Sequence, residues 1–144
     1  MTKFSIAVLA VLSLAGSLAA QSDIQLVVSV PFGFELADRS LPAGDYRVST
    51  GPRGIVWIRT ADLKTTLSVT AHAAQSAKAP VYGLTFNRYD DRYFLSKVWM
   101  GGSNGQEIPR SRAEHEQVRA RLVAKAAPQV VTILARQMVP VRTP

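Results

Sequence analysis

The chain has 144 residues, which is enough for one domain and too short for most two-domain arrangements. It contains no cysteine, which excludes disulfides, thiolate catalysis and cysteine-based metal sites. Lysine and arginine number 17 against 10 acidic residues, a formal net charge of +7, and twelve of the basic residues are arginines.

Residues 1–20 have the pattern of a secretory signal peptide. Lys3 is followed by an apolar stretch over residues 4–15 and then by small residues. The apolar stretch is shorter than the roughly 20 residues that span a bilayer. A buried N-terminal helix or a membrane anchor is the alternative interpretation. We expect cleavage after Ala20 or Ala19, which would leave a mature protein without a transmembrane segment, in the periplasm or outside the cell.

The chain then continues as a series of short strands. Residues 24–36 alternate between large apolar side chains and others, as a half-buried strand does. Pro31 removes one backbone donor, so we expect two short strands or one bent strand. Further strands are expected from Tyr46, over 55–60 and over 67–71, with turns at 41–45, 51–54 and 62–64.

Residues 72–80 lack a strand pattern and are expected to form a mobile loop. Alternation returns over 82–86 and leads into a hairpin connection at 87–91. The return strand over 92–100 carries bulky residues on both sides, so it should be central or covered on both faces. The glycine-rich segment 101–105 should form a flexible turn.

A helix is expected near the C-terminus. Ser111 and Glu114 have the spacing of a capping box, in which the serine oxygen accepts an amide hydrogen bond and the glutamate reaches back to the serine amide. The helix should end near Ala126, ahead of Pro128. Residues 129–134 are either a last strand or a helical continuation.

These elements predict a mainly β fold, an antiparallel β-sandwich or small barrel of six to seven strands with one C-terminal α-helix. The β domain should cover residues 21–110. The helix should occupy 111–127 and pack on that domain, and 128–144 should be a short strand or an extended tail. From Arg136 onward we expect poor order.

The search for catalytic motifs is negative. His72 and His115 lie in different elements, and neither has the cluster of ligands that a transition metal needs. Asp90 and Asp91 are turn residues whose side chains should point apart, and a Ca²⁺ site would need more oxygen ligands than one turn supplies. We therefore predict no enzymatic activity, no cofactor and no metal. A hydrolase would need an unrecognised site, for which the sequence offers no residue pair.

Six aromatic residues fall between residues 82 and 99, close to Arg88 and Arg92. They could form a stacking surface for sugars or nucleic acid, or the core of a hairpin with tyrosines at its rim. The alternating spacing favours the hairpin core. Nucleic acid is not expected as the main partner, because an exported protein seldom meets it.

Residues 30–34 read Val-Pro-Phe-Gly-Phe, and residues 41–48 read Leu-Pro-Ala-Gly-Asp-Tyr-Arg-Val. These blocks resemble a family of short exported bacterial β-proteins of unassigned function. The family opens with a VPFxF…LPAGxYxV pattern, which is similar to residues 30–34 and 41–48 here. Its later blocks resemble residues 84–89, 93–99 and 109–114. The resemblance implies export and a compact β domain, and it assigns no role to any residue.

The arginine excess suggests an anionic partner. From Ser111 onward the chain has six basic and two acidic residues, whereas residues 21–110 have ten and eight. We predict a non-catalytic structural or binding module of the bacterial cell envelope that associates with an anionic polysaccharide or lipid surface. The candidate anion contacts lie on the predicted helix and are Arg112, Arg119, Arg121 and Lys125.

The alternative function is a carrier of a small apolar ligand inside a β-barrel. Five aromatic residues would line its cavity, namely Phe32, Phe34, Trp57, Phe86 and Trp99. The same residues could simply fill the core. A cavity of about 300 Å³ or more would favour the carrier, and a solid interior would exclude it.

Overall fold

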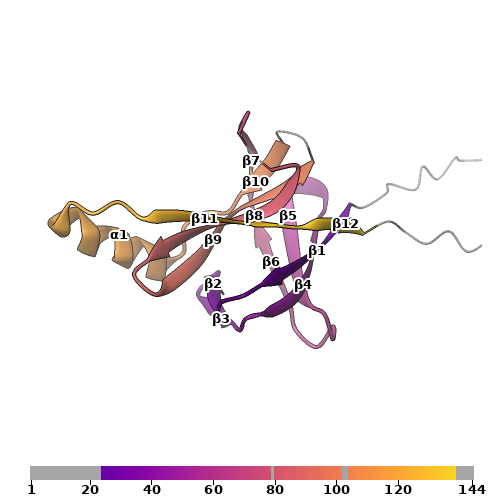
Figure 1. Ribbon diagram of the computed structural model, residues 1–144, viewed down its shortest axis with the longest axis horizontal. Coiled ribbons are helices and arrows are strands. Elements are labelled where there is room, and N and C mark those ends of the chain that lie inside the picture. Colours follow the sequence, from indigo (N-terminus) through magenta and orange to yellow (C-terminus); the bar gives the residue numbers. More distant parts are fainter. Residues whose placement is uncertain (1–23, 79, 102–103, 139–144) are drawn as a thin grey trace, which may run out of the picture.

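The computed structural model describes residues 24–78, 80–101 and 104–138 (Figure 1). These residues form twelve strands and one α-helix, which confirms the predicted mainly β fold. The strands make two sheets, so the protein is a β-sandwich and not a closed barrel. The predicted signal peptide over residues 1–20 lies outside the described residues.

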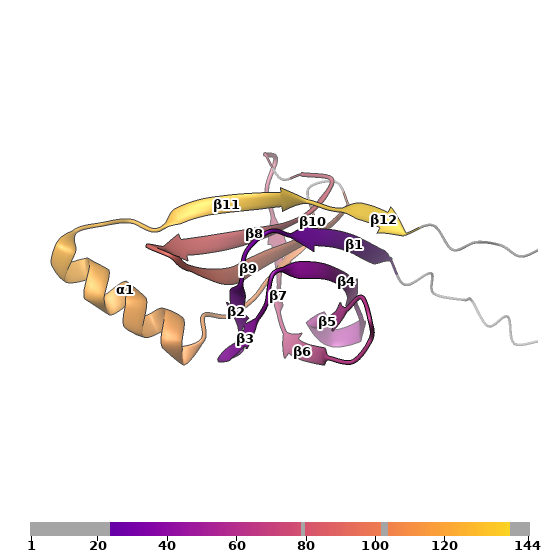
Figure 2. The ribbon, with the colours of Figure 1, turned by 60° about the horizontal axis from the view of Figure 1, so that its bottom comes forward.

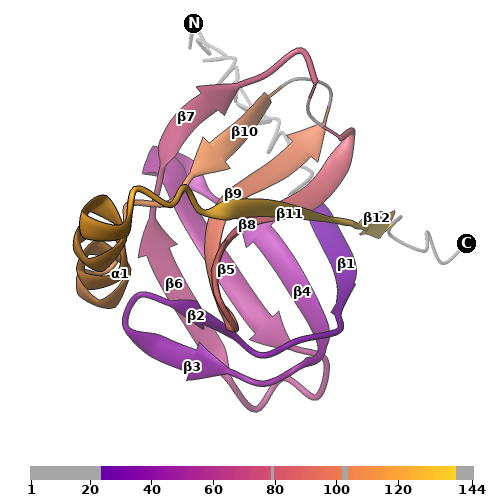
Figure 3. The same ribbon diagram turned by 60° about the vertical axis from the view of Figure 1, so that its left-hand side comes forward.

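One sheet has five antiparallel strands in the order β12-β1-β4-β5-β6 (Figure 3). The alternation along β1, β4 and β5 sends apolar side chains to the interior, while the outward positions carry mostly polar residues together with Val27, Ile55 and Trp57. The short 3₁₀ segment Pro52–Gly54 links β4 to β5, where a turn was predicted. The strands are β1 (Gln25–Val30), β4 (Gly44–Thr50), β5 (Ile55–Thr60), β6 (Thr66–Thr70) and β12 (Arg136–Met138).

The other sheet has seven strands, with the order β11-β8-β9-β10-β7 along its main path. A β2–β3 hairpin joins it, because Glu35 of β2 pairs in parallel with Phe94 of β9. Strand β9 lies between β8 and β10, which confirms its predicted central position. The strands are β2 (Phe34–Leu36), β3 (Arg39–Leu41), β7 (His72–Gln75), β8 (Tyr82–Tyr89), β9 (Arg92–Gly101), β10 (Asn104–Glu107) and β11 (Gln129–Leu134).

Two continuous stretches of chain pass from one sheet to the other. A single residue, Ala71, separates β6 from β7, and it donates its N–H to the carbonyl of Gly54 at 2.7 Å. Strand β11 likewise leads into β12 through Ala135, which donates to the carbonyl of Tyr82 at 3.1 Å. These bends connect both pairs of sheet edges and fix how the layers face each other.

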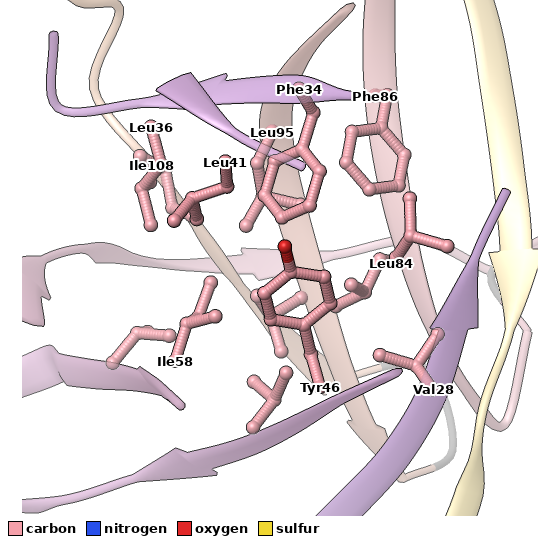
Figure 4. Packing of buried hydrophobic residues seen from close by; sticks show 14 of the residues in the cluster. Val28, Phe34, Leu36, Leu41, Tyr46, Ile58, Leu84, Phe86, Leu95 and Ile108 are labelled. Carbon is pink, nitrogen blue, oxygen red and sulfur yellow. The ribbon is translucent and has the colours of Figure 1, made fainter. Parts of the chain in front are cut away.

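The core lies between the two sheets (Figure 4). Its aromatic members meet edge to face, with the Phe34 ring 5.2 Å from Tyr46 and 5.3 Å from Phe86 between centroids. Aliphatic side chains from both sheets surround these rings, and Leu26, Val48 and Leu84 are completely buried. Burial of this apolar surface stabilises a fold that has no disulfide.

The helix α1 (Arg112–Ala124) lies at the end of the molecule, near the tip of the β8–β9 hairpin (Figure 2). Ser111 caps it by accepting the N–H of Glu114 at 3.2 Å, as expected. The helix ends two residues earlier than expected because Lys125 adopts a left-handed conformation, with φ of 52°. No helix in the described part of the chain is long and apolar enough to cross a membrane.

Several predicted boundaries were wrong. Residues 72–75 are a strand rather than a mobile loop, because β10 supplies backbone partners that the alanine-rich sequence does not reveal. The β8–β9 connection contains only Asp90 and Asp91, since β8 continues to Tyr89. Asn104 and Gly105, expected in a flexible turn, begin β10. These short strands raise the number above the predicted six to seven.

The end of the described chain settles one alternative and corrects another expectation. Of the two alternatives for Gln129–Leu134, the structure has the strand and not the helical continuation. Arg136–Met138, expected to be poorly ordered, pairs with Gln25–Val27 as an edge strand. Residues 139–144 of the predicted tail lie outside the described residues.

Candidate anion-binding face

The five aromatic residues considered for an apolar cavity do not line a common space. Phe34 and Phe86 are core residues. Phe32 is half-buried and contacts Phe86 edge to face, with 5.0 Å between the ring centroids. Trp57 points away from the core, on the outer side of β5. Trp99 is buried but lies outside the core cluster. Its indole N–H donates to Oγ1 of Thr85 at 2.9 Å.

The predicted basic contacts of α1 are dispersed. Arg112 and Arg119 border an open hollow of about 470 Å³ on the exposed side of the helix, and Arg112 pairs with Glu116 at 3.7 Å. Arg121 instead turns toward the β8–β9 hairpin and pairs with Asp90 at 2.8 Å. Lys125 stands at the end of the helix. The structure therefore brings together Arg112 and Arg119, and separates them from Arg121.

Glu114 attaches α1 to the β-sandwich. Glu114 is the buried residue of this helix, and the other described helix residues are at least partly exposed. Its Oε1 accepts hydrogen bonds from Nδ2 of Asn87 at 2.9 Å and from the hydroxyl of Tyr89 at 3.1 Å. Burial and the neighbouring Glu114 carboxylate raise the pKa of Tyr89 to about 12. Glu114 thus faces the sheet, and the described structure shows no return bond of the capping-box type to Ser111.

The hairpin aromatics do not offer an open stacking surface. The ring of Tyr93 stacks on Phe32 with 3.8 Å between centroids, and the guanidinium of Arg88 lies 5.4 Å from the Tyr93 centroid. Tyr89 packs edge to face against Phe94, with 5.6 Å between centroids. These contacts agree with the prediction of a hairpin core.

Two of the three charged residues that border the hollow beside the β2–β3 hairpin are paired with each other, and the third is Asp91. The hollow has a volume of about 400 Å³ and contains Glu35 and Arg92. Arg92 forms two parallel bonds to the Glu35 carboxylate, at 2.9 and 2.7 Å, which raise the pKa of the guanidinium. This pair connects β2 to β9, so the one cationic residue that borders the hollow is already paired, and the hollow does not suit an anion.

A row of arginines crosses the outer face of the five-stranded sheet. Arg47 of β4 lies directly opposite Arg59 of β5. On its other side Arg47 pairs in register with Val27 of β1, and Val27 pairs with Arg136 of β12. Arg47 lies between two buried residues of β4, so its side chain points outward. Arg59 is in register with Arg47, and Arg136 is in register with the outward Val27, so the three arginines share the outer face. We call Arg47, Arg59 and Arg136 the arginine row.

The arginine row has no compensating carboxylate among the described residues, whose three ion pairs involve other arginines. Two carboxylates lie nearby but are hydrogen bonded to other residues, namely Asp45, two positions from Arg47 on the same side of β4, and Asp62 in the β5–β6 turn. Asp45 accepts from the hydroxyl of Ser29 at 2.5 Å. Asp62 accepts from Thr60 and, at 3.0 Å, from the N–H of Lys64, and these bonds lower its pKa.

A small hollow lies between the two opposed arginines. Its volume is about 110 Å³, and Gln25, Ser49 and Leu63 border it together with Arg47 and Arg59. Like charges directly across a strand pair destabilise a sheet, so the apposition carries a cost in the free protein. An oxyanion bound between the guanidiniums would remove that cost and accept several hydrogen bonds.

The sequence contained only part of the signal for this row. Arg47 and Arg59 each occupy an outward position of a predicted strand, so their facing was readable from the alternation. Their apposition depends on the register of β4 against β5, which periodicity does not determine. Arg136 lies in the segment expected to be poorly ordered, so the sequence does not place it on a strand.

Comparisons with protein-family models, curated proteins and solved structures found no match. Within the described residues no group of three or more histidine, aspartate or glutamate side chains is placed to hold a metal ion. His72 and His115 are both exposed and lie on different elements, β7 and α1.

Proposed function

We propose that this protein is an exported, non-catalytic binding module of the bacterial cell envelope, and that it binds an anionic component on the outer face of its five-stranded sheet. The observation that carries the proposal is the direct apposition of Arg47 and Arg59 without a carboxylate partner among the described residues. Planar guanidiniums bind carboxylate and phosphate groups in pairs of parallel hydrogen bonds.

The proposed ligand is still an anionic component, but the proposed contact residues are those of the arginine row and not those of α1. On α1, Arg121 is held by Asp90 and Arg112 by Glu116, so two of the four predicted contacts already have acidic partners. The arginine row spans β12, β1, β4 and β5, and offers its charges on one continuous surface. A polyanion can contact several of these charges at once.

Export is supported by the composition of residues 1–20, with one early lysine, an apolar centre and small residues before Gln21. The resemblance to short exported β-proteins agrees with it. The apolar-carrier alternative gains no support, because aromatic and aliphatic side chains from both sheets fill the interior.

Calorimetric titration of the mature protein with polygalacturonate, a carboxylated polymer, tests the proposal. The affinity should fall steeply between about 50 and 200 mM NaCl, because the binding is electrostatic. The double variant Arg47→Gln/Arg59→Gln should bind about tenfold more weakly or worse. The matched control Arg112→Gln/Arg119→Gln removes the same charge from α1 and should change the affinity less than about twofold. Equal losses in both variants would contradict binding at this face.

A further inference from the structure

A second set of side chains lies next to the arginine row on the same outer face. Trp57 of β5 pairs in register with Ser49 of β4 and with Ser68 of β6, and Ser49 pairs with Gln25 of β1. These residues are two positions along each strand from the row, so they point to the same side of the sheet as the arginines. Met138 of β12 pairs in register with Gln25, so an indole, two hydroxyls, an amide and a thioether form a band parallel to the charges.

Trp57 is held in place rather than buried. Its indole covers Gly51, where the Cβ of any other residue would clash with the ring. The side chain remains half-buried on the outer side of the sheet, while Val56 and Ile58 on either side of it point into the core. A fixed, partly open aromatic surface can stack on the apolar face of a sugar ring.

A lipid bilayer fits this face less well. Membrane-surface binding buries large apolar side chains beside basic ones. The most exposed large apolar residues of the described chain are instead Val123 of α1 and Leu134 of β11, which belong to other elements. The apolar neighbours of the arginines on this face, Val27, Ile55 and Met138, are half-buried. Leu63 at the β5–β6 turn is exposed, and the residues in register with Trp57 are serines.

We infer that the anionic component is an acidic polysaccharide that lies across the five-stranded sheet. Its carboxylates pair with Arg47 and Arg59, and a sugar ring stacks on Trp57. Ser49, Ser68 and Gln25 hydrogen bond to hydroxyls of the chain. Residues two positions apart along a strand are about 7 Å apart, so one sugar chain can contact both the arginine row and the band beside it. This inference rests on the proposed function and specifies its ligand.

Two substitutions of Trp57 separate stacking from structure. Trp57→Phe keeps a flat ring, whereas Trp57→Leu keeps apolar bulk over Gly51 without a ring face. With polygalacturonate as the probe, Trp57→Leu should bind about tenfold more weakly than the wild type, and Trp57→Phe within about threefold of it. Thermal unfolding of both variants shows whether each is folded. The wild-type indole emission should also change on binding, and Trp57→Phe should abolish that change because Trp99 is buried on the other sheet.

The possible results distinguish failure of the polysaccharide inference from failure of the proposed anion-binding function. If Trp57→Leu binds polygalacturonate as the wild type does while Arg47→Gln/Arg59→Gln binds weakly, the stacking inference fails and the anion-binding face stands. If phosphatidylglycerol vesicles bind and polygalacturonate does not, the ligand is a lipid and the polysaccharide inference is overturned. If the arginine variant binds polygalacturonate normally, both proposals fail. Uncharged dextran should not bind, and binding of dextran equal to that of polygalacturonate would contradict a requirement for charge.

Discussion

Glu114 shows how one buried carboxylate can hold a helix that contributes little apolar surface. It is 3% exposed, and its Oε1 accepts hydrogen bonds from both Asn87 and Tyr89. The exposed Leu122 and Val123 make no comparable contribution to docking. Attachment of α1 therefore depends on polar contacts, together with the ion pair between Arg121 and Asp90.

Replacing Glu114 by Ala should lower the free energy of unfolding by about 1–3 kcal/mol, because Asn87 and Tyr89 lose their shared acceptor in a buried place. Glu116→Ala is the matched control on the same helix. It removes only a surface pair with Arg112 and should cost less than about 1 kcal/mol. Urea unfolding followed by circular dichroism measures both, and equal losses would refute the role given to Glu114.

Tyr89 should make the folded state sensitive to alkaline pH. Burial raises its pKa from 10.0 to about 12. The unfolded chain loses the phenolic proton near pH 10 while the folded chain keeps it, so this contribution to stability is complete below pH 10 and is lost between pH 10 and about 12. Burial raises the pKa of Tyr46 as well, in the same direction.

Tyr89→Phe isolates the contribution of Tyr89. The variant should be less stable near neutral pH because it lacks the bond to Glu114, yet its stability should decline less steeply between pH 10 and 12. Urea midpoints measured at several alkaline pH values give the comparison. Parallel decline of the two proteins would show that Tyr89 titrates alike in the folded and unfolded states.

At the scale of elements, the strands with clear alternation were predictable and the short ones were not. The spacing of apolar residues predicts the inner face of a strand, as it does for Leu26 and Val28 in β1 and for Val56 and Ile58 in β5. Strand β7, His72–Gln75, contains two alanines and no large apolar residue, so only its pairing with β10 makes it a strand. The sequence of a strand alone does not show which distant strand will pair with it.

The sequence draws attention to arginine side chains, but it does not show which arginines the fold places side by side. The basic residues of α1 are close in sequence, which makes the helix a candidate. In the structure, however, helical geometry disperses them, and Arg112 and Arg121 each pair with an acidic neighbour. The arginine row is assembled from residues of three strands, and its members are between 12 and 89 positions apart in the sequence. Charge counted along the chain therefore suggests a polyanion ligand, but it does not reveal the surface that sheet pairing creates.

At the scale of the whole molecule, the strand pair β11–β12 connects the two layers. Strand β11 pairs with β8 in the seven-stranded sheet, and β12 pairs with β1 in the five-stranded sheet. The hydroxyl of Tyr82 also donates to the side-chain carbonyl of Gln137 at 2.7 Å, across the bend at Ala135. The same stretch brings Arg136 beside β1, so the last described strand contributes both to the layer packing and to the arginine row.

Ending the chain at Ala135 should therefore weaken the fold and the site together. Strand β1 would lose its pairing with Arg136–Met138 and become an exposed sheet edge, which favours aggregation. We expect a loss of about 1–3 kcal/mol in the free energy of unfolding, from the backbone bonds and the Tyr82–Gln137 contact. A chain ending at Met138 is the control, since it keeps every described strand. Urea unfolding and light scattering compare the two, and equal stability without aggregation would show that β12 is dispensable for joining the layers.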